Sequence, residues 1–276
     1  MVLDIDEAIK KEALRRGYSF RTIKTYQLCA EKFLKFSNKT IDKISKKDVK
    51  EYLDLLVDNG KAGNTINVNL NALKFLFEEI LGKRMRLNIK YSKKPLKLPV
   101  VLSKEEVKKL FSVIENPAHL LMIKLMYSAG LRVSELINLK IEDLKLNEGY
   151  GYVRQGKGNK DRIFIIAESL KQELRSYIGK KKLNEYDYLF VSNRNEKYSV
   201  RSLQVIIKKA CKKAKLDKNI SCHSLRHSFA THLLENGYKI HEIQLMLGHK
   251  SPETTFTYLR TISPQLLNIK SPIDSL

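Results

Sequence analysis

Hydrophobic residues recur at helical spacing through the first ninety positions of the chain. In "TIKTYQLCAEKFLKF" the apolar positions include Ile23, Phe33 and Phe36, and in "TINVNLNALKFLFEEIL" they run from Ile66 to Ile80. Residues three, four or seven apart share one face of an α-helix, so both stretches predict amphipathic helices. The N-terminal third of the chain is therefore expected to be a small helical unit.

Capping signals divide this helical unit from the rest of the chain. In "SKKDVKEYLDLLVDNG", Ser45 stands where an N-cap is expected and Gly60 stands where a helix stops. After two prolines, Ser103 with Glu106 three residues later opens a new helix as a capping box. We predict a helical domain over residues 1–91, an extended linker over 92–101 and a second domain over 102–276.

The pattern changes inside the second domain. Helical segments around 103–115 and 118–129 are followed by alternating apolar and polar residues in "YGYVR" and "RIFII". The glycine-rich "QGKGNKD" separates the two alternating segments, which predicts a β-hairpin or a small meander. Helical spacing returns from about residue 168. The predicted fold class is mostly α with a small antiparallel β-sheet.

Composition points to a polyanionic partner. The 276 residues include 52 Lys and Arg against 30 Asp and Glu, a formal net charge of +22. Such an excess favours nucleic acid first and an anionic membrane surface second, although any single lysine is more often a solvated helix residue. No apolar run approaches the roughly 20 residues of a membrane span, and the N-terminus lacks a signal-peptide pattern. We therefore expect a cytoplasmic protein with no membrane partner.

The three cysteines are consistent with that compartment. Cys29, Cys211 and Cys222 form no metal-ligand spacing and cannot all pair with one another. Unpaired thiols persist where the environment is reducing, as in the cytoplasm.

One glycine-rich stretch resembles a nucleotide-binding loop but fails its requirements. "GYVRQGKG" places Lys157 after Gly156, yet Gly158 follows where Ser or Thr would hold magnesium. The flanking segments are strand-like on both sides, whereas a phosphate-binding loop must open a helix. Lys157 is therefore read as the tip of a hairpin. It is either an ordinary solvated turn residue or a lysine that reaches into a groove as a charge or proton donor.

A histidine cluster is the strongest chemical signal in the chain. Three of the six histidines, His223, His227 and His232, lie within "CHSLRHSFATHLLENG" at 222–237. The spacing lacks the glutamate of a zinc helix, and Arg226 in its centre would repel a divalent cation. His223 and Arg226 are three apart and share a helix face, where Arg226 can grip a phosphate through two parallel hydrogen bonds and His223 can exchange a proton. For His227 and His232, packing or capping is the better interpretation.

A second signal follows downstream. Helical spacing from Ile240 to Leu247 ends at Gly248, and His249 stands in the turn. Ser251-Pro252-Glu253 then opens a short helix that carries Tyr258. Alone, Tyr258 would be an ordinary core or surface residue.

Five separated motifs together resemble one family. "AGLRVSEL" (129–136), "GKGNKDR" (156–162), "HSLRHSFATHLL" (223–234), "LGH" (247–249) and "TYLR" (257–260) are similar, in this order, to the tyrosine recombinase (phage integrase) family. The chain most resembles the Xer recombinases, with an archaeal XerA-like layout. The resemblance extends weakly to residues 1–91, which are similar to the family's helical, SAM-like core-binding domain.

The resemblance implies roles for particular residues. Arg132 and Arg226 would hold the scissile phosphate, and Lys157 would protonate the leaving 5′ oxygen. His223 would be the general acid and base, and His249 would donate a hydrogen bond to the phosphate.

It also implies a nucleophile and its support. Tyr258 would attack the phosphorus, and Glu135 would orient the arginines, although a plain helix salt bridge is an equally good interpretation of Glu135. The family uses neither a metal nor another cofactor. Its members assemble on double-stranded DNA, as a tetramer in synapsis, through a C-terminal helix that docks into a neighbouring subunit. The prolines of "TISPQLLNIKSPIDSL" leave room for only a short helix here.

The implied activity is site-specific recombination through a 3′-phosphotyrosyl intermediate and a Holliday junction, with resolution of chromosome dimers as the Xer-type role. Three alternatives remain open at this point. They are an integrase of a mobile element or virus, a type IB topoisomerase-like enzyme, and a non-catalytic DNA-binding protein.

Overall fold

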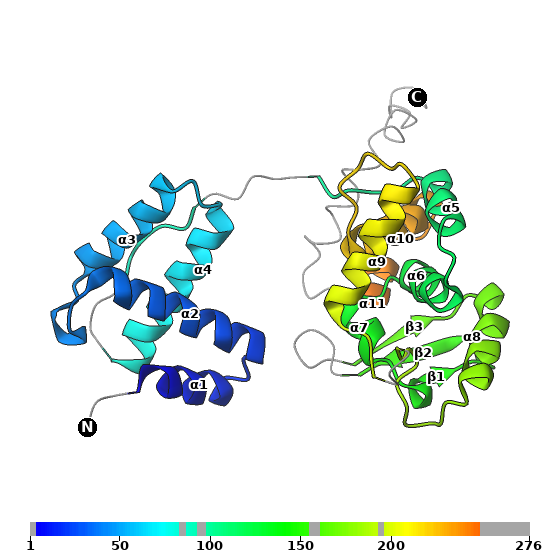
Figure 1. The fold of residues 1–276 in the computed structure, drawn as a ribbon, viewed down its shortest axis with the longest axis horizontal. Helices are drawn as coiled ribbons and strands as arrows, with labels where there is room; N and C mark the ends of the chain where they lie inside the picture. The colour runs from blue at the N-terminus through cyan, green and yellow to red at the C-terminus, as the bar shows by residue number, and fades with distance from the viewer. Residues whose placement is uncertain (1–3, 83–86, 93–97, 155–160, 193–195, 249–276) are drawn as a thin grey trace, which may run out of the picture. The chain divides into compact units, whose positions relative to one another are not determined.

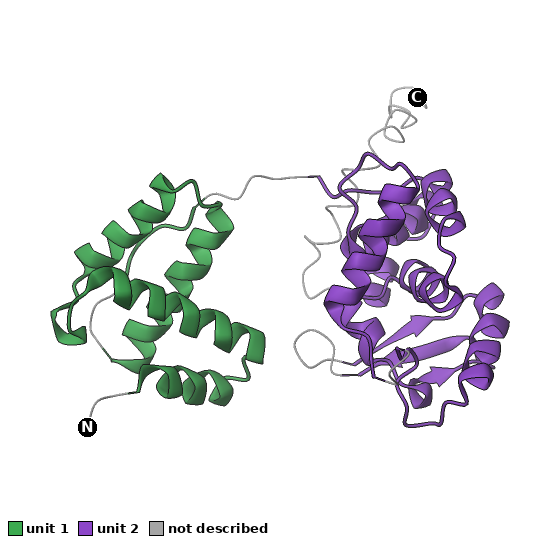
Figure 2. Cartoon of the chain, viewed as in Figure 1, with its two compact units in different colours: residues 1–96 green, residues 97–276 purple. Residues whose placement is uncertain are grey.

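The computed structural model describes residues 4–82, 87–92, 98–154, 161–192 and 196–248. The chain divides into two compact units, residues 1–96 and 97–276 (Figure 2). Each unit has a hydrophobic core of its own, and each is described by itself below.

The first unit is built from helices only within its described residues. In chain order these are α1 (Ile5–Arg15), α2 (Phe20–Ser37), the 3₁₀ turn η1 (Ile41–Lys43), α3 (Lys46–Asp58), α4 (Gly63–Lys74) and η2 (Phe75–Ile80), as Figure 1 shows. The predicted helix over 66–80 is present, but its last six residues form a π-helix. The wider turn brings Phe75, Leu76 and Phe77 all into the core.

Aromatic side chains form the centre of this first core. The Phe33 ring meets the Tyr52 ring at 5.4 Å and the Phe77 ring at 5.7 Å between centroids, both edge to face. Such pairs add about 0.5–1.5 kcal/mol beyond the area they bury. The helical spacing of apolar residues in the sequence therefore corresponds to a packed interior.

The predicted start of α3 is confirmed. Ser45 precedes the helix, and the Asp48 carboxylate accepts hydrogen bonds from the Ser45 backbone N–H at 2.8 Å and from its hydroxyl at 2.7 Å. The Lys39 ammonium also pairs with Asp48. Gly60, with φ of 63°, lies just after the end of the helix, as predicted.

Asn67 fixes the chain where it leaves the first unit. Its side-chain nitrogen donates to the Ser92 carbonyl at 3.0 Å, and its side-chain oxygen accepts from the Ser92 N–H at 2.8 Å. The Asn67 side chain is thus buried with both its donor and its acceptor used.

The second unit combines helices with one small sheet. Its elements are α5 (Lys104–Ser112), α6 (Pro117–Ala129), α7 (Val133–Asn138), η3 (Ile141–Asp143), β1 (Leu144–Lys145), β2 (Tyr150–Val153), β3 (Arg162–Ile165), α8 (Glu168–Lys181), α9 (Val200–Lys213), α10 (Cys222–Glu235) and α11 (Ile240–Leu247). The capping box predicted at the start of α5 is present: Ser103 Oγ accepts from the Glu106 N–H at 3.2 Å, and Glu106 accepts from the Ser103 N–H at 2.7 Å.

The sheet is an antiparallel meander in the order β1-β2-β3. Tyr150 lies opposite Ile165, and Val153 lies opposite Arg162. A side chain at Gly151 would collide with Phe164, whose ring atom would be 2.4 Å from the added carbon. The glycine therefore lets the buried Phe164 ring lie across the neighbouring strand. The predicted fold class, mostly α with a small antiparallel sheet, is confirmed.

Helix α10 lies against α6 in the second unit and also holds the segment that enters the unit (Figure 1). The buried Leu102 N–H donates to Ser228 Oγ on α10 at 2.9 Å. The His232 ring, also on α10, bonds the Leu102 backbone and meets the Tyr127 hydroxyl of α6 at 2.8 Å. One face of α10 is thus joined to α6 and to the start of the unit.

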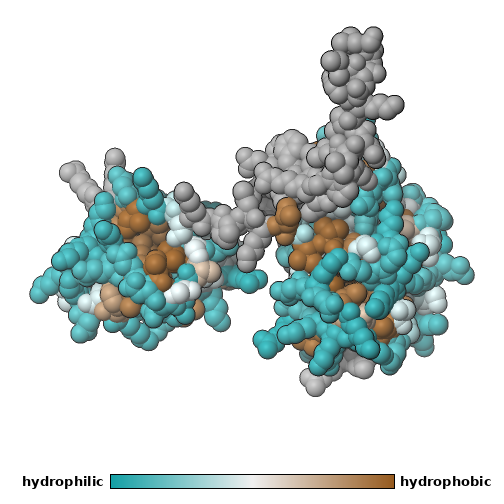
Figure 3. Space-filling model, turned by 90° about the horizontal axis from the view of Figure 1, so that it is seen from above, coloured by the Kyte–Doolittle hydropathy of each residue, from teal (hydrophilic) through white to brown (hydrophobic). Residues whose placement is uncertain are grey.

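The cysteines Cys29, Cys211 and Cys222 are all buried and free of disulfides. Burial raises the pKa of each thiol, and that of Cys222 to about 11. Over the described helices, none has the length and apolar character needed to cross a membrane. Figure 3 shows hydrophilic residues over most of the coloured surface of each unit, with patches of apolar residues among them on each unit.

Candidate active site

Three arginines from three separate elements meet at one carboxylate, that of Glu135 on α7. Arg132 immediately precedes α7, Arg162 begins β3, and Arg226 lies in the middle of α10. Glu135 Oε1 accepts from Arg132 Nη1 at 2.6 Å, and Glu135 Oε2 accepts from Arg162 Nη2 at 2.7 Å. Arg226 Nη1 lies 3.8 Å from Glu135 Oε2. The group of Arg132, Glu135, Arg162 and Arg226 is called the arginine cluster below.

Glu135 is ionised in this setting although it is only 7% exposed. Burial alone would raise its pKa, but the charges of Arg162 and Arg132, with hydrogen bonds from Arg132, hold the pKa below its ordinary value. The sequence left open whether Glu135 orients the arginines or forms a plain helix salt bridge. Its contacts reach beyond α7 to β3 and α10, so a pair within one helix does not describe it.

Arg226 is held by the protein backbone. Its Nη1 donates to the Gly130 carbonyl and its Nη2 to the Leu247 carbonyl, both at 2.5 Å, and the residue is 3% exposed. The sequence predicted that Arg226 binds a phosphate through two parallel hydrogen bonds. In this structure each terminal nitrogen donates one hydrogen bond to a carbonyl, and the contact with phosphate stays a prediction.

Arg132 is the more accessible of the two predicted phosphate arginines. Its side chain is 18% exposed, against 4% for that of Arg226. The Arg132 backbone N–H also donates to Glu135 Oε2 at 2.8 Å, which fixes the start of α7. The Arg132 guanidinium is therefore partly exposed, while the Arg132 backbone is hydrogen-bonded at the start of α7.

Gly130 lets α6 approach α10 closely just before Arg132. It ends α6 in the left-handed conformation, with φ of 58°, and a side chain there would come within 2.5 Å of the Phe229 ring. Only glycine fits both conditions. This turn directs the Gly130 carbonyl toward Arg226.

The histidines of α10 differ in burial. His223 is exposed, while His227 is partly buried with its ring centroid 6.4 Å from that of His223. Burial, followed by the charges of His223 and Arg226, lowers the pKa of His227 to about 4. His232 is buried against Tyr127, and burial lowers its pKa as well. His227 and His232 thus have the neutral, packed character expected of supporting histidines, and His223 faces solvent.

Three predicted site residues, Lys157, His249 and Tyr258, lie outside the described residues. The described chain reaches Arg154 and resumes at Asp161 on either side of the Lys157 segment, and it ends at Gly248. Within the described ranges, no group of three or more His, Cys, Asp or Glu is placed to hold a metal ion.

Arg162 is a site residue that sequence reasoning missed. It closes the motif "GKGNKDR", but no role was assigned to it. The signal was available in the strand pattern, because a charged residue at the start of an apolar strand is costly unless it is paired. Its partners Glu135 and Met246 are distant in sequence, so the pairing itself could not be read from the chain.

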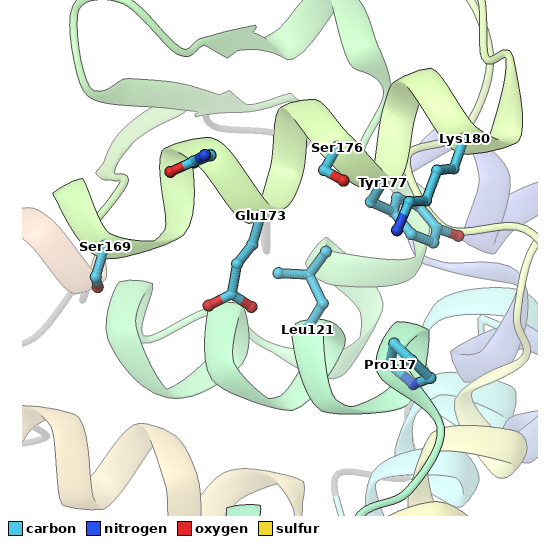
Figure 4. A pocket seen from close by; sticks show the side chains of 8 residues that line it. Pro117, Leu121, Ser169, Glu173, Ser176, Tyr177 and Lys180 are labelled. Carbon is cyan, nitrogen blue, oxygen red and sulfur yellow. The ribbon is translucent and has the colours of Figure 1, made fainter.

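A groove between α6 and α8 lies apart from this cluster. It has a volume of about 540 Å³ and is lined by residues including Leu121, Glu173, Tyr177 and Lys180 (Figure 4). None of the predicted site residues lines it. The groove is therefore separate from the arginine cluster.

Comparison with known proteins agrees with this fold. Residues 100–263 match the phage integrase family, and residues 6–87 match the N-terminal SAM-like domain of phage integrases. Tyrosine recombinase XerA of Pyrococcus horikoshii is 39% identical over 255 residues, covering 91% of this chain and 86% of the relative. Tyrosine recombinase XerD of Oceanobacillus iheyensis is 36% identical over 276 residues, covering 92% of each.

Solved structures show the same similarity. A crystal structure of XerA recombinase matches with a TM-score of 0.56 and 34% identity, covering 95% of this chain and 97% of the other. XerH site-specific recombinase bound to a palindromic difH substrate matches with a TM-score of 0.75 and 26% identity, covering 91% and 79%.

The chain therefore belongs to the phage integrase family, whose catalytic and N-terminal models together cover most of its length. Within that family it is similar to the Xer tyrosine recombinases, as the sequence motifs predicted. The prediction that it is an enzyme for DNA strand breakage and rejoining is confirmed by the same relatives.

Proposed function

We propose that this protein is an Xer-type site-specific recombinase that cuts and rejoins double-stranded DNA, exchanges strands through a Holliday junction and resolves chromosome dimers. The observation that carries the proposal is the arginine cluster. Three guanidinium groups share one carboxylate there, so two positive charges are left in excess beside the surface-reaching Arg132.

An excess of fixed positive charge is what this chemistry requires. A phosphodiester repels nucleophiles, and its five-coordinate transition state concentrates further negative charge on the non-bridging oxygens. Guanidinium groups held in place before the reaction stabilise that charge without reorganising. Glu135 holds Arg132 in place, because its carboxylate accepts hydrogen bonds from both the backbone and the side chain of Arg132.

The remaining roles follow the family motifs. Tyr258 attacks the phosphorus and forms a 3′-phosphotyrosyl bond while the 5′ oxygen leaves. A tyrosine hydroxyl in water has a pKa of about 10, so attack calls for a positive pocket and a base such as His223 to favour deprotonation. Lys157 donates the proton to the leaving oxygen, and His249 donates a hydrogen bond to the phosphate. A 5′ hydroxyl of another strand then reverses the attack, so the exchange needs no ATP.

We also propose a division of labour between the two parts of the chain. Residues 1–91 bind DNA as a core-binding domain, 92–101 form the linker, and 102–276 carry out catalysis. The match of residues 6–87 to the SAM-like domain supports this division, and the whole-chain charge of +22 supports DNA binding. The protein acts in the cytoplasm and assembles on its site as a homotetramer, with affinity dominated by phosphate contacts and therefore steeply dependent on salt.

The decisive experiment traps the covalent intermediate. The wild-type protein and Tyr258→Phe are incubated with a library of nicked duplexes, and adducts are isolated under denaturing conditions and sequenced at the attachment point. The wild-type protein should become covalently attached to the 3′ phosphate of the DNA at one site. Tyr258→Phe should bind the same DNA and yield no adduct. Adducts in both proteins would exclude Tyr258 as nucleophile, and adducts in neither would favour a non-catalytic DNA-binding protein.

A leaving-group test addresses Lys157. Lys157→Ala should slow cleavage of a normal duplex far more than cleavage of a 5′-thio substrate, because a thiolate leaves without being protonated. General acid catalysis typically contributes about 10²–10⁴-fold, which is the expected size of the difference. Equal slowing on both substrates would count against the proton-donor role.

A mobile-element integrase is a second candidate, because a putative integrase/recombinase of Sinorhizobium fredii is 34% identical over 268 residues. The sequenced attachment points distinguish the two. A single chromosomal target supports dimer resolution, and a pair of element ends supports integration. Relaxation of any supercoiled plasmid without exchange would instead indicate a type IB topoisomerase-like enzyme.

A further inference from the structure

Arg162 joins two parts of the second unit that are far apart in sequence. Its Nη2 donates to Glu135 Oε2 and its Nη1 donates to the Met246 carbonyl, both at 2.7 Å. Its side chain is 9% exposed. Arg162 therefore connects the carboxylate of the arginine cluster with the C-terminal end of α11.

The end of α11 is held by two arginines. The Met246 carbonyl accepts from Arg162, and the next carbonyl, that of Leu247, accepts from Arg226 at 2.5 Å. The last carbonyls of a helix have no donor within the helix and carry a partial negative charge. Two guanidinium groups that also border Glu135 thus supply the missing donors.

Gly248 shows how closely the helix end lies against Arg162. It ends α11 with φ of 62°, and a side chain there would come within 2.8 Å of Arg162 Cδ. The space beside Gly248 is therefore already occupied by the Arg162 side chain. The chain continues directly to His249, which lies outside the described residues.

We propose that Arg162 is a positioning residue for DNA cleavage. It fixes the position of Glu135, and through Glu135 that of Arg132, relative to the end of α11. From that end the chain continues to His249 and Tyr258. The proposal rests on the proposed function, because it assumes that cleavage takes place at the arginine cluster.

A direct contact between Arg162 and DNA is the competing role. Its burial argues against that role, since its side chain is only 9% exposed and both terminal nitrogens are turned toward protein oxygens. The two roles predict different measurements. A phosphate contact lowers DNA affinity and reduces its salt dependence by about one unit of slope, whereas a positioning residue leaves both unchanged and slows cleavage.

The test compares Arg162→Met and Arg162→Lys with Arg175→Met. Arg175 on α8 donates to the Asn147 side chain at 2.9 Å and takes no part in the cluster, so it controls for loss of one arginine. Three quantities are measured: DNA affinity against salt, the single-turnover rate of adduct formation, and hydrogen–deuterium exchange of the α11 amides. Arg162→Lys keeps the buried charge, so the test remains decisive if Arg162→Met does not fold.

We expect Arg162→Met to form adduct about 100-fold more slowly, the scale of a 1 Å misplacement of a reacting group. Arg162→Lys should fall between it and the wild type, because one ammonium cannot span both oxygens with the geometry of a guanidinium. Exchange in α11 should rise in the Arg162 variants and stay unchanged in Arg175→Met. DNA affinity and its salt slope should match the wild type throughout.

A pH profile adds a readout that simple destabilisation would not move. Without Arg162, burial still raises the pKa of Glu135 while its largest lowering influence is gone. Glu135 then takes up a proton as the pH falls, so cleavage by Arg162→Met should decline at low pH more steeply than that of the wild type. Adding Glu135→Gln, which has no carboxylate to titrate, should remove the extra decline.

Each result decides a different point. Unchanged exchange in α11, unchanged cleavage, or a lower salt slope in the Arg162 variants would overturn the inference. Absence of any adduct in the wild type would overturn the proposed function, and the exchange experiment would still decide whether Arg162 holds α11.

Discussion

The first unit keeps its ion pairs at or near the surface, including the sequence-distant pair of Arg16 and Glu79, whereas the second unit buries arginines around one carboxylate. In the first, Glu31 pairs with Lys35 one turn further along α2, and both side chains are more than half exposed. In the second, Arg226 is 3% exposed and meets Glu135 from another helix. Burying a charge is costly because it loses its hydration, so a buried ion pair is rarely the most stable choice for a core. The contrast indicates that the second unit holds its charges for chemistry and the first does not.

The largest expected effect comes from removing the shared carboxylate. Glu135→Ala leaves Arg226 and Arg162 buried without their counter-charge, and should lower the free energy of unfolding of the second unit by about 3–5 kcal/mol. The change is measured by denaturant titration. Glu31→Ala is the matched control in the first unit, and its exposed pair should give no measurable change. Equal effects at the two sites would remove the contrast between the units.

A smaller effect is expected where the chain enters the second unit. Ser228→Ala leaves the Leu102 N–H buried without its acceptor and should cost about 1–2 kcal/mol. Ser228→Thr, which keeps the hydroxyl, is the control for loss of the hydrogen bond. If Ser228→Ala unfolded at the same denaturant concentration as the wild type, the bond would not contribute to stability.

An effect of comparable size is a dependence of stability on pH. In the folded protein the pKa of His227 is lowered to about 4 by burial, whereas in the unfolded chain it is about 6.5. Between these values the unfolded chain binds a proton that the folded protein does not, so stability falls as the pH drops from about 6.5 toward 4. His227→Gln should reduce the difference in melting temperature between pH 7 and pH 5. The exposed His241→Gln serves as the control, and an equal reduction in both variants would exclude His227 as the cause.

Local patterns predicted the elements well, and for a physical reason. Capping at Ser45 and Ser103 depends on residues three positions apart, which the sequence displays directly. The π-helical turn at 75–80 was not predicted, because the apolar spacing of the sequence does not distinguish it from an α-helical turn.

Among the described residues, the predicted Arg132, Glu135 and Arg226 lie together, but their contacts could not be predicted from the sequence. Arg132 and Arg226 were found because family motifs preserve residue types in order. That Arg226 bonds the Gly130 and Leu247 carbonyls, and that Arg162 joins Glu135 to α11, depends on contacts across 21 to 96 residues for Arg226 and 27 to 84 for Arg162. Such contacts follow from the tertiary fold and leave no local periodicity in the sequence.

The reactivity of the buried cysteines can report when each unit opens. Because their thiols are enclosed and weakly acidic, an alkylating reagent can reach Cys29 only when the first unit opens, and Cys211 or Cys222 only when the second does. Mass spectrometry of the labelled peptides would then time the opening of the two halves in one unmodified molecule. Labelling of all three at a single rate would mean that the halves open together.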